Sequence, residues 1–231
     1  MLAELARQDQ IAHDLANAAT PGYKPDRLAQ RSFGDLLLTR GGTPIGSLSL
    51  GVGIAEARTD MTPSPLRETG DPLDVGLVGE GFLSVRTPAG VAYTRDGQLS
   101  VDSAGHLVTS AGFPLLDRDG SPIAVASAGD VQIASDGTVT SAGKTAGRLA
   151  VVSLTGAQRL GDGLYAGTAG ETPVGGALRQ GQLEASGVNA ASAMVEMMVS
   201  LRAFEANQRV VRAIDETLGR GINGLGGQGG S

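Results

Sequence analysis

Histidine and carboxylate side chains supply most general acids, general bases and metal ligands, so they are the first residues to place. The chain has only two histidines, His13 in a segment of helical periodicity and His106 beside a predicted β-turn. The carboxylates closest to forming pairs are Glu4 with Asp14 and Asp71 with Asp74. No pattern places either pair in a pocket, and carboxylates are most often solvated. These residues therefore predict polar surface positions and no catalytic or metal site.

Two loops have the spacing of ligand-binding motifs. Gly161-Asp162-Gly163-Leu164-Tyr165-Ala166 has the spacing of a dinucleotide-binding loop, but no strand and helix of a βαβ unit frame it. Asp117-Arg118-Asp119-Gly120 is similar to the start of a calcium loop, but the later ligands are missing, which predicts a hairpin turn. Cysteine is absent, which excludes disulfides and thiolate metal sites. We expect no cofactor, no bound metal and no enzymatic activity.

The composition restricts the classes of partner. The 231 residues carry a formal net charge of -6 without a run of lysine and arginine, which argues against nucleic acid. Glycine is abundant at 36 residues and aromatic residues make up only 3%, so we expect an aliphatic core with many tight turns. No apolar stretch of about 18 residues is present, and the N-terminal sequence is not a conventional secretory signal. Neither nucleic acid nor a small-molecule substrate is expected as a partner.

Residues 188–218 contain the strongest periodic pattern. Residues in alternating steps of three and four, as in a coiled-coil seam, are Met194, Met197, Leu201, Phe204, Gln208, Val211, Asp215 and Leu218. A second row beside them consists of Val199, Ala203, Ala206, Val210 and Ile214. The pattern predicts a helix of about 30 residues that stops at Gly219 and Gly221. One helix cannot bury so wide a face on itself, so it needs another helix, in this chain or in another.

The methionines Met194, Met197 and Met198 allow a second interpretation. Clustered methionines can line an adaptable binding groove. At helical spacing, however, a packing face is the simpler interpretation of these residues.

Residues 1–19 form a second predicted helix. Leu2, Leu5, Ile11 and Leu15 give an imperfect apolar stripe in an alanine-rich segment. Pro21-Gly22 is a strong turn signal, and the residues before Pro25 are expected to be extended. Judged from composition alone, this stretch is an ordinary helix stop followed by a turn.

The middle of the chain alternates short apolar runs with turn signals. Residues 26–66 are predicted as an extended linker, in which 33–38 form a short helical or strand piece. Residues 67–180 are predicted as a β domain with hairpins at Asp96-Gly97 and Asp136-Gly137 and a strand over 148–154. This spacing is typical of a compact barrel or sandwich.

The expected fold class is α+β, with N- and C-terminal helices forming a coiled-coil-like assembly region around a middle all-β domain. The predicted segments are 1–25 (helix and turn), 26–66 (linker), 67–180 (β domain), 181–220 (helix) and 221–231 (glycine-rich tail).

Three stretches, in order along the chain, resemble the axial proteins of the bacterial flagellum, the rod and hook subunits. The first stretch, residues 15–24, reads Leu-Ala-Asn-Ala-Ala-Thr-Pro-Gly-Tyr-Lys and is similar to the N-terminal signature of that family. The second includes 72–75, 79–82, 93–97 and 105–109, and is similar to the opening of the family's middle β domain. The third combines 183–189 with 194–207 and is similar to the C-terminal signature. Asp14 and Gly187 stand where asparagine is common in the family.

This resemblance implies a structural role. It implies a subunit of the basal-body rod, most similar to the proximal rod subunit and next to the distal one. Such subunits are exported by the flagellar export apparatus without a cleaved signal and polymerise helically into the periplasm-spanning drive shaft that transmits torque from motor to hook. The implied partners are other copies and neighbouring rod and hook proteins. The implied assembly residues are Leu15, Asn17, Tyr23, Met194, Met197, Leu201, Phe204, Val211 and Leu218.

One alternative remains from the residues themselves. The chain could be a secreted β-domain binding module that its helices oligomerise. That hypothesis predicts an exposed aromatic platform on the β domain.

Overall fold

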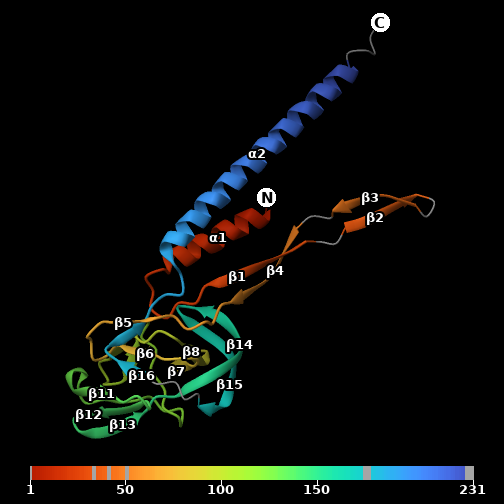
Figure 1. Ribbon diagram of the computed structural model, residues 1–231. Coiled ribbons are helices and arrows are strands. Elements are labelled where there is room, and N and C mark those ends of the chain that lie inside the picture. The colour runs from red at the N-terminus through yellow and green to blue at the C-terminus, as the bar shows by residue number, and fades with distance from the viewer. Residues whose placement is uncertain (1, 33–34, 41–42, 50–51, 174–177, 227–231) are drawn as a thin grey trace. The chain divides into compact units, whose positions relative to one another are not determined.

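The computed structural model describes residues 2–32, 35–40, 43–49, 52–173 and 178–226 (Figure 1). They fall into two compact units. The helical unit consists of the described parts of 1–16, 28–58 and 190–231, and the β unit consists of those of 17–27 and 59–189. The fold class is α+β, with a mostly β middle and a long C-terminal helix.

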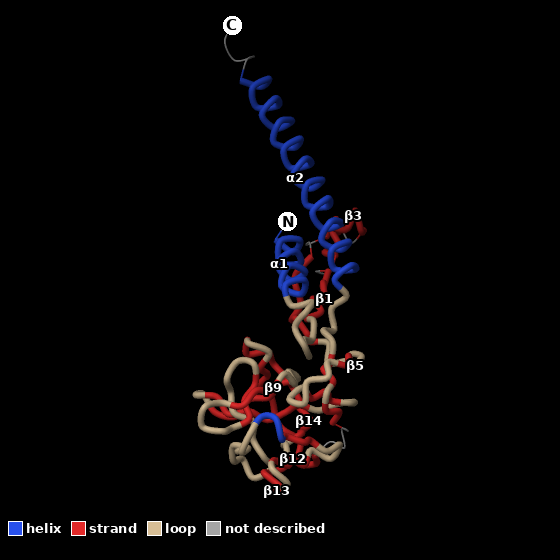
Figure 2. The backbone as a smooth tube through the Cα atoms, turned by 90° about the vertical axis from the view of Figure 1, so that its left-hand side faces the viewer, coloured by secondary structure: helices blue, strands red, loops and turns tan. Residues whose placement is uncertain are grey.

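Two α-helices belong to the helical unit. Helix α1 spans Leu2–Ala16 and helix α2 spans Ala190–Gly226, and α1 lies beside the first turns of α2 (Figures 1 and 2). The predicted stop at Gly219 and Gly221 is wrong, because α2 continues through both glycines. Glycine inside a helix costs only about 1 kcal/mol relative to alanine, so it does not by itself end one. Among the described residues, no helix is long and apolar enough to cross a membrane.

Four strands occupy most of the stretch 26–59. They are β1 (Asp26–Ser32), β2 (Asp35–Arg40), β3 (Thr43–Ser49) and β4 (Val52–Thr59). β1 pairs with β4, and β2 pairs antiparallel with β3. The structure thus shows paired strands in the stretch 26–66 that we expected as an extended linker, and β2 makes 35–40 a strand. Residues 33 and 34 of that predicted piece lie outside the described residues.

The β unit contains short strands joined by many loops (Figure 2). Its strands are β5 (Leu66–Glu68), β6 (Val75–Leu77), β7 (Phe82–Thr87), β8 (Gly90–Thr94), β9 (Leu99–Val101), β10 (Leu107–Thr109), β11 (Val131–Ile133), β12 (Thr138–Ser141), β13 (Lys144–Arg148), β14 (Val151–Gly161), β15 (Leu164–Pro173), β16 (Leu178–Gln180) and β17 (Gln182–Glu184), with a 3₁₀ turn η1 at Ala128–Asp130. Strands β14, β15, β8 and β7 close into a barrel, and β11, β12 and β13 form a three-stranded sheet. Small two-stranded sheets pair β9 with β10, β16 with β6 and β17 with β5.

The core of the β unit is almost wholly aliphatic, as the composition predicts. Leu83, Val85, Leu107, Leu115 and Val139 are fully buried in one cluster. Burial of such side chains contributes about 1.5–3 kcal/mol each, so this cluster is the main source of stability in the unit.

The strand predictions met different outcomes. The hairpin at Asp136-Gly137 is confirmed by the pairing of β11 with β12. The hairpin at Asp96-Gly97 is wrong, since β8 pairs with β7 and β15 while β9 pairs with β10. The amide of Val75 bonds the carbonyl of Gly97 at 2.9 Å, so another chain segment occupies the site where the hairpin partner would lie. The predicted strand 148–154 is divided between β13 and β14.

Candidate functional site

Helix α1 covers one face of the first turns of α2. Ile11 of α1 and Ala193 and Ser200 of α2 are buried. The hydroxyl of Ser200 donates to Oε2 of Glu4 at 3.2 Å, which pairs a buried polar group that would otherwise be costly. Met197 and Phe204, spaced four residues from Ala193 and Ser200, lie on the same face and are half-buried.

Further along α2, the same face is not covered by α1 and is exposed to solvent. Five turns of an α-helix take about 18 residues, so Val211 stands directly above Ala193 and Leu218 above Ser200. Ala193 and Ser200 are 9% and 3% exposed, whereas Val211 and Leu218 are 44% and 59% exposed. Helix α1 has 15 residues and α2 has 37, so α1 is too short to cover the whole face.

Apolar side chains are also exposed on other sides of α2. They are Met194, Val195, Met198, Val199, Leu201, Val210 and Ile214. The predicted seam residues therefore have two environments. Met197 and Phe204 lie on the face that α1 covers, whereas Met194, Leu201, Val211 and Leu218 are exposed. We call Met194, Leu201, Val211 and Leu218 the exposed seam.

The other predicted assembly residues lie at the beginning of the chain. Leu15 is half-buried in α1. Asn17 and Tyr23 belong to the β unit, where the carbonyl of Asn17 accepts from Ser186 Oγ at 3.0 Å and the carbonyl of Tyr23 accepts from the Gly187 amide at 2.8 Å. The segments 17–27 and 182–189, which follow α1 and precede α2 in the sequence, thus lie side by side.

The predicted turn at Pro21-Gly22 is tightly enclosed. Gly22 has a φ of +65°, a conformation that favours glycine, and its amide donates to the Glu184 carbonyl at 2.9 Å. A Cβ at this position would lie 2.3 Å from the carbonyl oxygen of Arg95. Only glycine therefore fits here without movement of the backbone.

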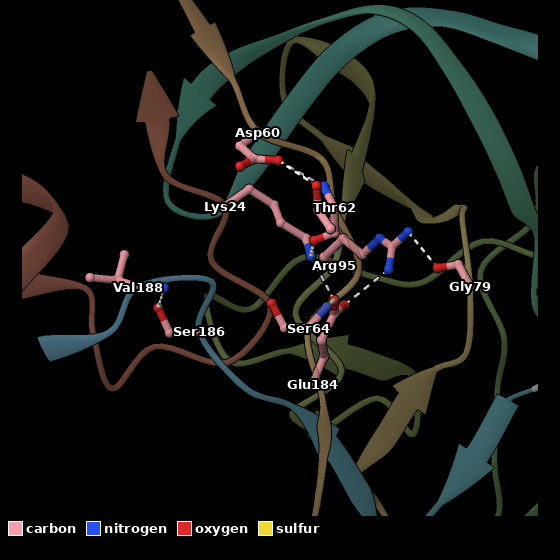
Figure 3. A network of polar contacts seen from close by, with 9 residues as sticks. All are labelled: Lys24, Asp60, Thr62, Ser64, Gly79, Arg95, Glu184, Ser186 and Val188. Carbon is pink, nitrogen blue, oxygen red and sulfur yellow. Dashed lines mark hydrogen bonds and ion pairs between the residues drawn. The ribbon is translucent and has the colours of Figure 1, made fainter. Parts of the chain in front are cut away.

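Three buried charges meet beneath this turn, and we call Lys24, Arg95 and Glu184 the charge cluster. Figure 3 shows Lys24 and Arg95 directed at the Glu184 carboxylate. Lys24 Nζ lies 2.6 Å from Oε1 and Arg95 Nη1 lies 3.0 Å from Oε2. All three residues are at most 2% exposed. The cluster holds two cations and one anion, so Glu184 is shared.

Backbone groups add three hydrogen bonds to the cluster, while the buried Nε of Arg95 has no hydrogen-bond partner among the described residues. Lys24 Nζ donates to the Thr62 carbonyl at 2.7 Å, the Ser64 amide donates to Glu184 Oε1 at 2.7 Å, and Arg95 Nη2 donates to the Gly79 carbonyl at 2.8 Å (Figure 3). Burial lowers the pKa of Lys24; the hydrogen bond and charge of Glu184 oppose this effect, and the charge of Arg95 adds to it.

An aromatic group packs close to the cluster. The Arg159 guanidinium lies 4.5 Å from the centre of the Tyr23 ring and donates to the Lys24 carbonyl, and it lies 3.5 Å from Asp26. Tyr165 is buried, and burial raises the pKa of its hydroxyl. Tyr23 is therefore buried and held by packing against Arg159.

Two further kinds of site, a metal centre and an aromatic platform, can be compared with the described residues. Among them, no group of three or more His, Asp or Glu side chains is placed to hold a metal ion. None of the aromatic side chains whose burial the structure describes is exposed, since Tyr23, Phe82 and Tyr165 are buried and Tyr93, Phe113 and Phe204 are half-buried. The aromatic platform that the binding-module hypothesis predicts is therefore missing from this part of the chain.

No sequence pattern indicated a role for Lys24, Arg95 or Glu184. Each lies within a motif that carries the family resemblance, beside Tyr23, Thr94 and Leu183 respectively. Charged residues next to apolar or turn residues are a weak signal of burial, and nothing in a single sequence indicates which of them pair.

Two family models match this chain. The model described as "Flagellar basal body rod FlgEFG protein C-terminal" matches residues 179–225, and the one described as "Flagellar hook protein FlgE/F/G D1 domain" matches residues 76–141.

Individual relatives match over most of the chain. The flagellar basal-body rod protein FlgF of Escherichia coli (strain K12) is 35% identical, over 94% of this chain and 91% of its own length. The flagellar hook-basal body complex protein FlhO of Bacillus subtilis (strain 168) is 31% identical, over 98% and 95%. The flagellar basal-body rod protein FlgG of the same organism is 31% identical, over 93% and 92%.

Proposed function

Because the chain belongs to the family of flagellar basal-body rod proteins, we propose that it is a structural subunit of the rod that polymerises helically through its terminal helices. Its place is the basal body of the flagellum. The proposed role is mechanical and not enzymatic: the polymer forms the shaft that transmits torque from motor to hook.

The proposed interface rests on one observation. The face of α2 that α1 covers near the start of the helix is exposed further along the helix. Val211 and Leu218 repeat the helical positions of Ala193 and Ser200 but lack the cover that α1 provides there. Together with Met194 and Leu201 they expose large apolar side chains along one helix. Exposed apolar surface of this kind is typical of a face that a partner covers.

We propose that helices of neighbouring copies cover the exposed seam in a coiled-coil-like region. Met197 and Phe204 then pack between α1 and α2, while Met194, Leu201, Val211 and Leu218 pack between subunits. Leu15, Asn17 and Tyr23 fix the direction in which the chain leaves α1. The further partners are neighbouring rod and hook proteins, and the flagellar export apparatus delivers the chain without a cleaved signal.

The proposed position is the proximal rod, with the distal rod as the alternative. Relatives named FlgF and FlgG match at similar identity, 35% and 31%. Electron microscopy of basal bodies from a deletion strain distinguishes the two positions. Retention of the proximal rod segment in that strain would contradict the proximal assignment.

The interface is tested by placing a carboxylate in the exposed seam. In Val211→Asp and Leu201→Asp, burying an unpaired charge between subunits costs several kcal/mol per contact, so we expect a folded subunit that is absent from purified rods and cells that do not swim. Val91→Asp makes the same change at a valine of the β unit that is 56% exposed, and it should leave assembly intact. Normal rods in both seam variants would show that α2 does not form the interface.

A further inference from the structure

The members of the charge cluster come from three different parts of the chain. Lys24 lies in the segment 17–27, Glu184 ends β17, and Arg95 follows β8. Lys24 and Glu184 are 160 residues apart, and Arg95 and Glu184 are 89 residues apart. The cluster is therefore complete only when both terminal segments of the β unit are docked on its middle.

The charge cluster has two positive side chains and only one negative side chain. Lys24 and Arg95 both contact the carboxylate of Glu184, and Arg95 by its own charge disfavours protonated Lys24. The charge of Asp60 also favours protonated Lys24, but less than the charge of Glu184 does. The carboxylate oxygens of Asp60 already accept hydrogen bonds from Thr62 and Arg27. Removing Glu184 would leave two buried cations without their shared anion, the most costly way to break such a group.

Backbone hydrogen bonds tie the two terminal segments together beside the cluster. The Gly22 amide donates to the Glu184 carbonyl at 2.9 Å, and the Gly187 amide donates to the Tyr23 carbonyl at 2.8 Å. These two amides report on whether the segments 17–27 and 182–189 are docked on each other, because an amide exchanges with solvent only when its bond opens.

We propose that Glu184 is a positioning residue that permits segment 17–27 to dock, because without its carboxylate Arg95 repels Lys24 from the site. The N-terminal segment then joins the β unit only together with the C-terminal segment, and the two are held or released as one. Glu184 would act in this way in the folded subunit whether or not the subunit enters a rod.

An ordinary ion pair and a positioning carboxylate predict different results when each partner is neutralised. If Lys24 were simply the residue that holds its segment, Lys24→Met would release the segment as fully as Glu184→Gln. If Glu184 relieves repulsion, Lys24→Met removes one of the two cations and leaves Arg95 and Glu184 balanced. The N-terminal segment should then stay docked.

The test is hydrogen exchange on the purified full-length subunit, read at the amides of Gly22 and Gly187. In Glu184→Gln we expect exchange at both amides to rise together by roughly 100-fold or more, while Leu107 and Leu115 of the core stay protected. In Lys24→Met we expect a rise of less than about tenfold. Glu80→Gln, the same change at an exposed glutamate, is the matched control and should not alter either amide.

The double variant Lys24→Met/Glu184→Gln completes the test. It has one unpaired cation in place of two, so the Gly22 amide should be better protected than in Glu184→Gln alone. Equal release in Lys24→Met and Glu184→Gln would overturn the proposal. The Ala185 amide donates to the Pro65 carbonyl at 2.9 Å and so reports on the C-terminal segment alone, and its continued protection while Gly22 exchanges in Glu184→Gln would also overturn the proposal. If Glu184→Gln does not fold, a folded double variant supports the proposal, and a double variant that also fails to fold overturns it.

Discussion

The exposed seam of α2 and the charge cluster of the β unit depart from the usual distribution of residues in opposite ways. Leu218 is apolar and 59% exposed, whereas Glu184 is charged and 2% exposed. An exposed apolar side chain is stabilised when a second protein surface covers it. A buried charge, in contrast, is strongly destabilising unless an opposite charge and hydrogen-bond partners lie beside it in the same fold. The cluster is complete within the folded chain and the seam is not. We therefore expect changes in the charge cluster to act on the stability of the subunit, and changes in the exposed seam to act on its assembly.

The largest effect on the free energy of unfolding is expected for Glu184→Leu. This change leaves Lys24 and Arg95 buried without their anion, and such losses cost about 3–5 kcal/mol. Chemical denaturation of the purified subunit measures the change, with Glu80→Leu as the exposed control. A loss of less than about 1 kcal/mol would mean that the two cations reach water easily, and the contrast between the two regions would disappear.

A smaller effect is expected from adding a side chain at Gly187. A Cβ at this position would lie 2.8 Å from Cδ of Pro25, so Gly187→Asn should cost about 1–3 kcal/mol through overpacking. Pro25→Ala removes the obstructing ring, and the double variant should recover most of the loss. A double-mutant cycle by denaturation checks this, and additive costs would show that Pro25 is not the cause.

The pH dependence of stability should change modestly in Asp96→Asn. Burial raises the pKa of Asp96 above its ordinary value, although hydrogen bonds from Ser110 and Gln98 oppose this. A carboxyl whose pKa is raised by folding binds more protons in the native state, so its contribution to stability falls as pH rises through the window between the two pKa values. Asp96→Asn should remove this slope, and the difference from wild type should not exceed about 1 kcal/mol. The free energy of unfolding of wild type and Asp96→Asn is measured between about pH 4 and pH 7. The same dependence on pH in both proteins would contradict a raised pKa of Asp96.

The smallest effect on the isolated subunit is expected in the exposed seam. Leu218→Asp should change the free energy of unfolding by about 0.5 kcal/mol or less, because the side chain is exposed there. The same variant should fail to enter rods. A large loss of stability in the isolated subunit would show that Leu218 is already covered in solution, and the two regions would no longer differ in kind.

Local patterns predicted the elements whose partners are close in sequence. The period of 188–218 identified α2, and the alternation around Asp136-Gly137 identified the hairpin of β11 and β12. The hairpin at Asp96-Gly97 had the same local signal but was wrong, since a distant segment, Val75, occupies the position of the expected partner. An Asp-Gly pair predicts a turn, but it does not predict which strands pair on either side of that turn.

The candidate site was predictable only in part for the same reason. Periodicity identified the apolar face of α2 but not which residues α1 covers, because that depends on where α1 ends against α2. The charge cluster had no local signal, since its pairs are 160 and 89 residues apart. The domain boundaries proposed from sequence, such as 67–180, stay predictions, although the β unit of the structure also includes 17–27 and 181–189.

The strand pairs of the β unit also have a kinetic consequence. β17 pairs with β5 and β16 with β6, and Thr69 donates to the Gly181 carbonyl across 112 residues. Contacts between such distant residues slow folding, because the entropy of closing the loop is lost before the contacts form. Synthesis begins at the N-terminus, so β5 and β6 have no native partners until residues 178–184 have been made. A growing chain of this protein therefore spends most of its synthesis without a native β unit, and that leaves a long interval in which it can be handled as an unfolded polypeptide.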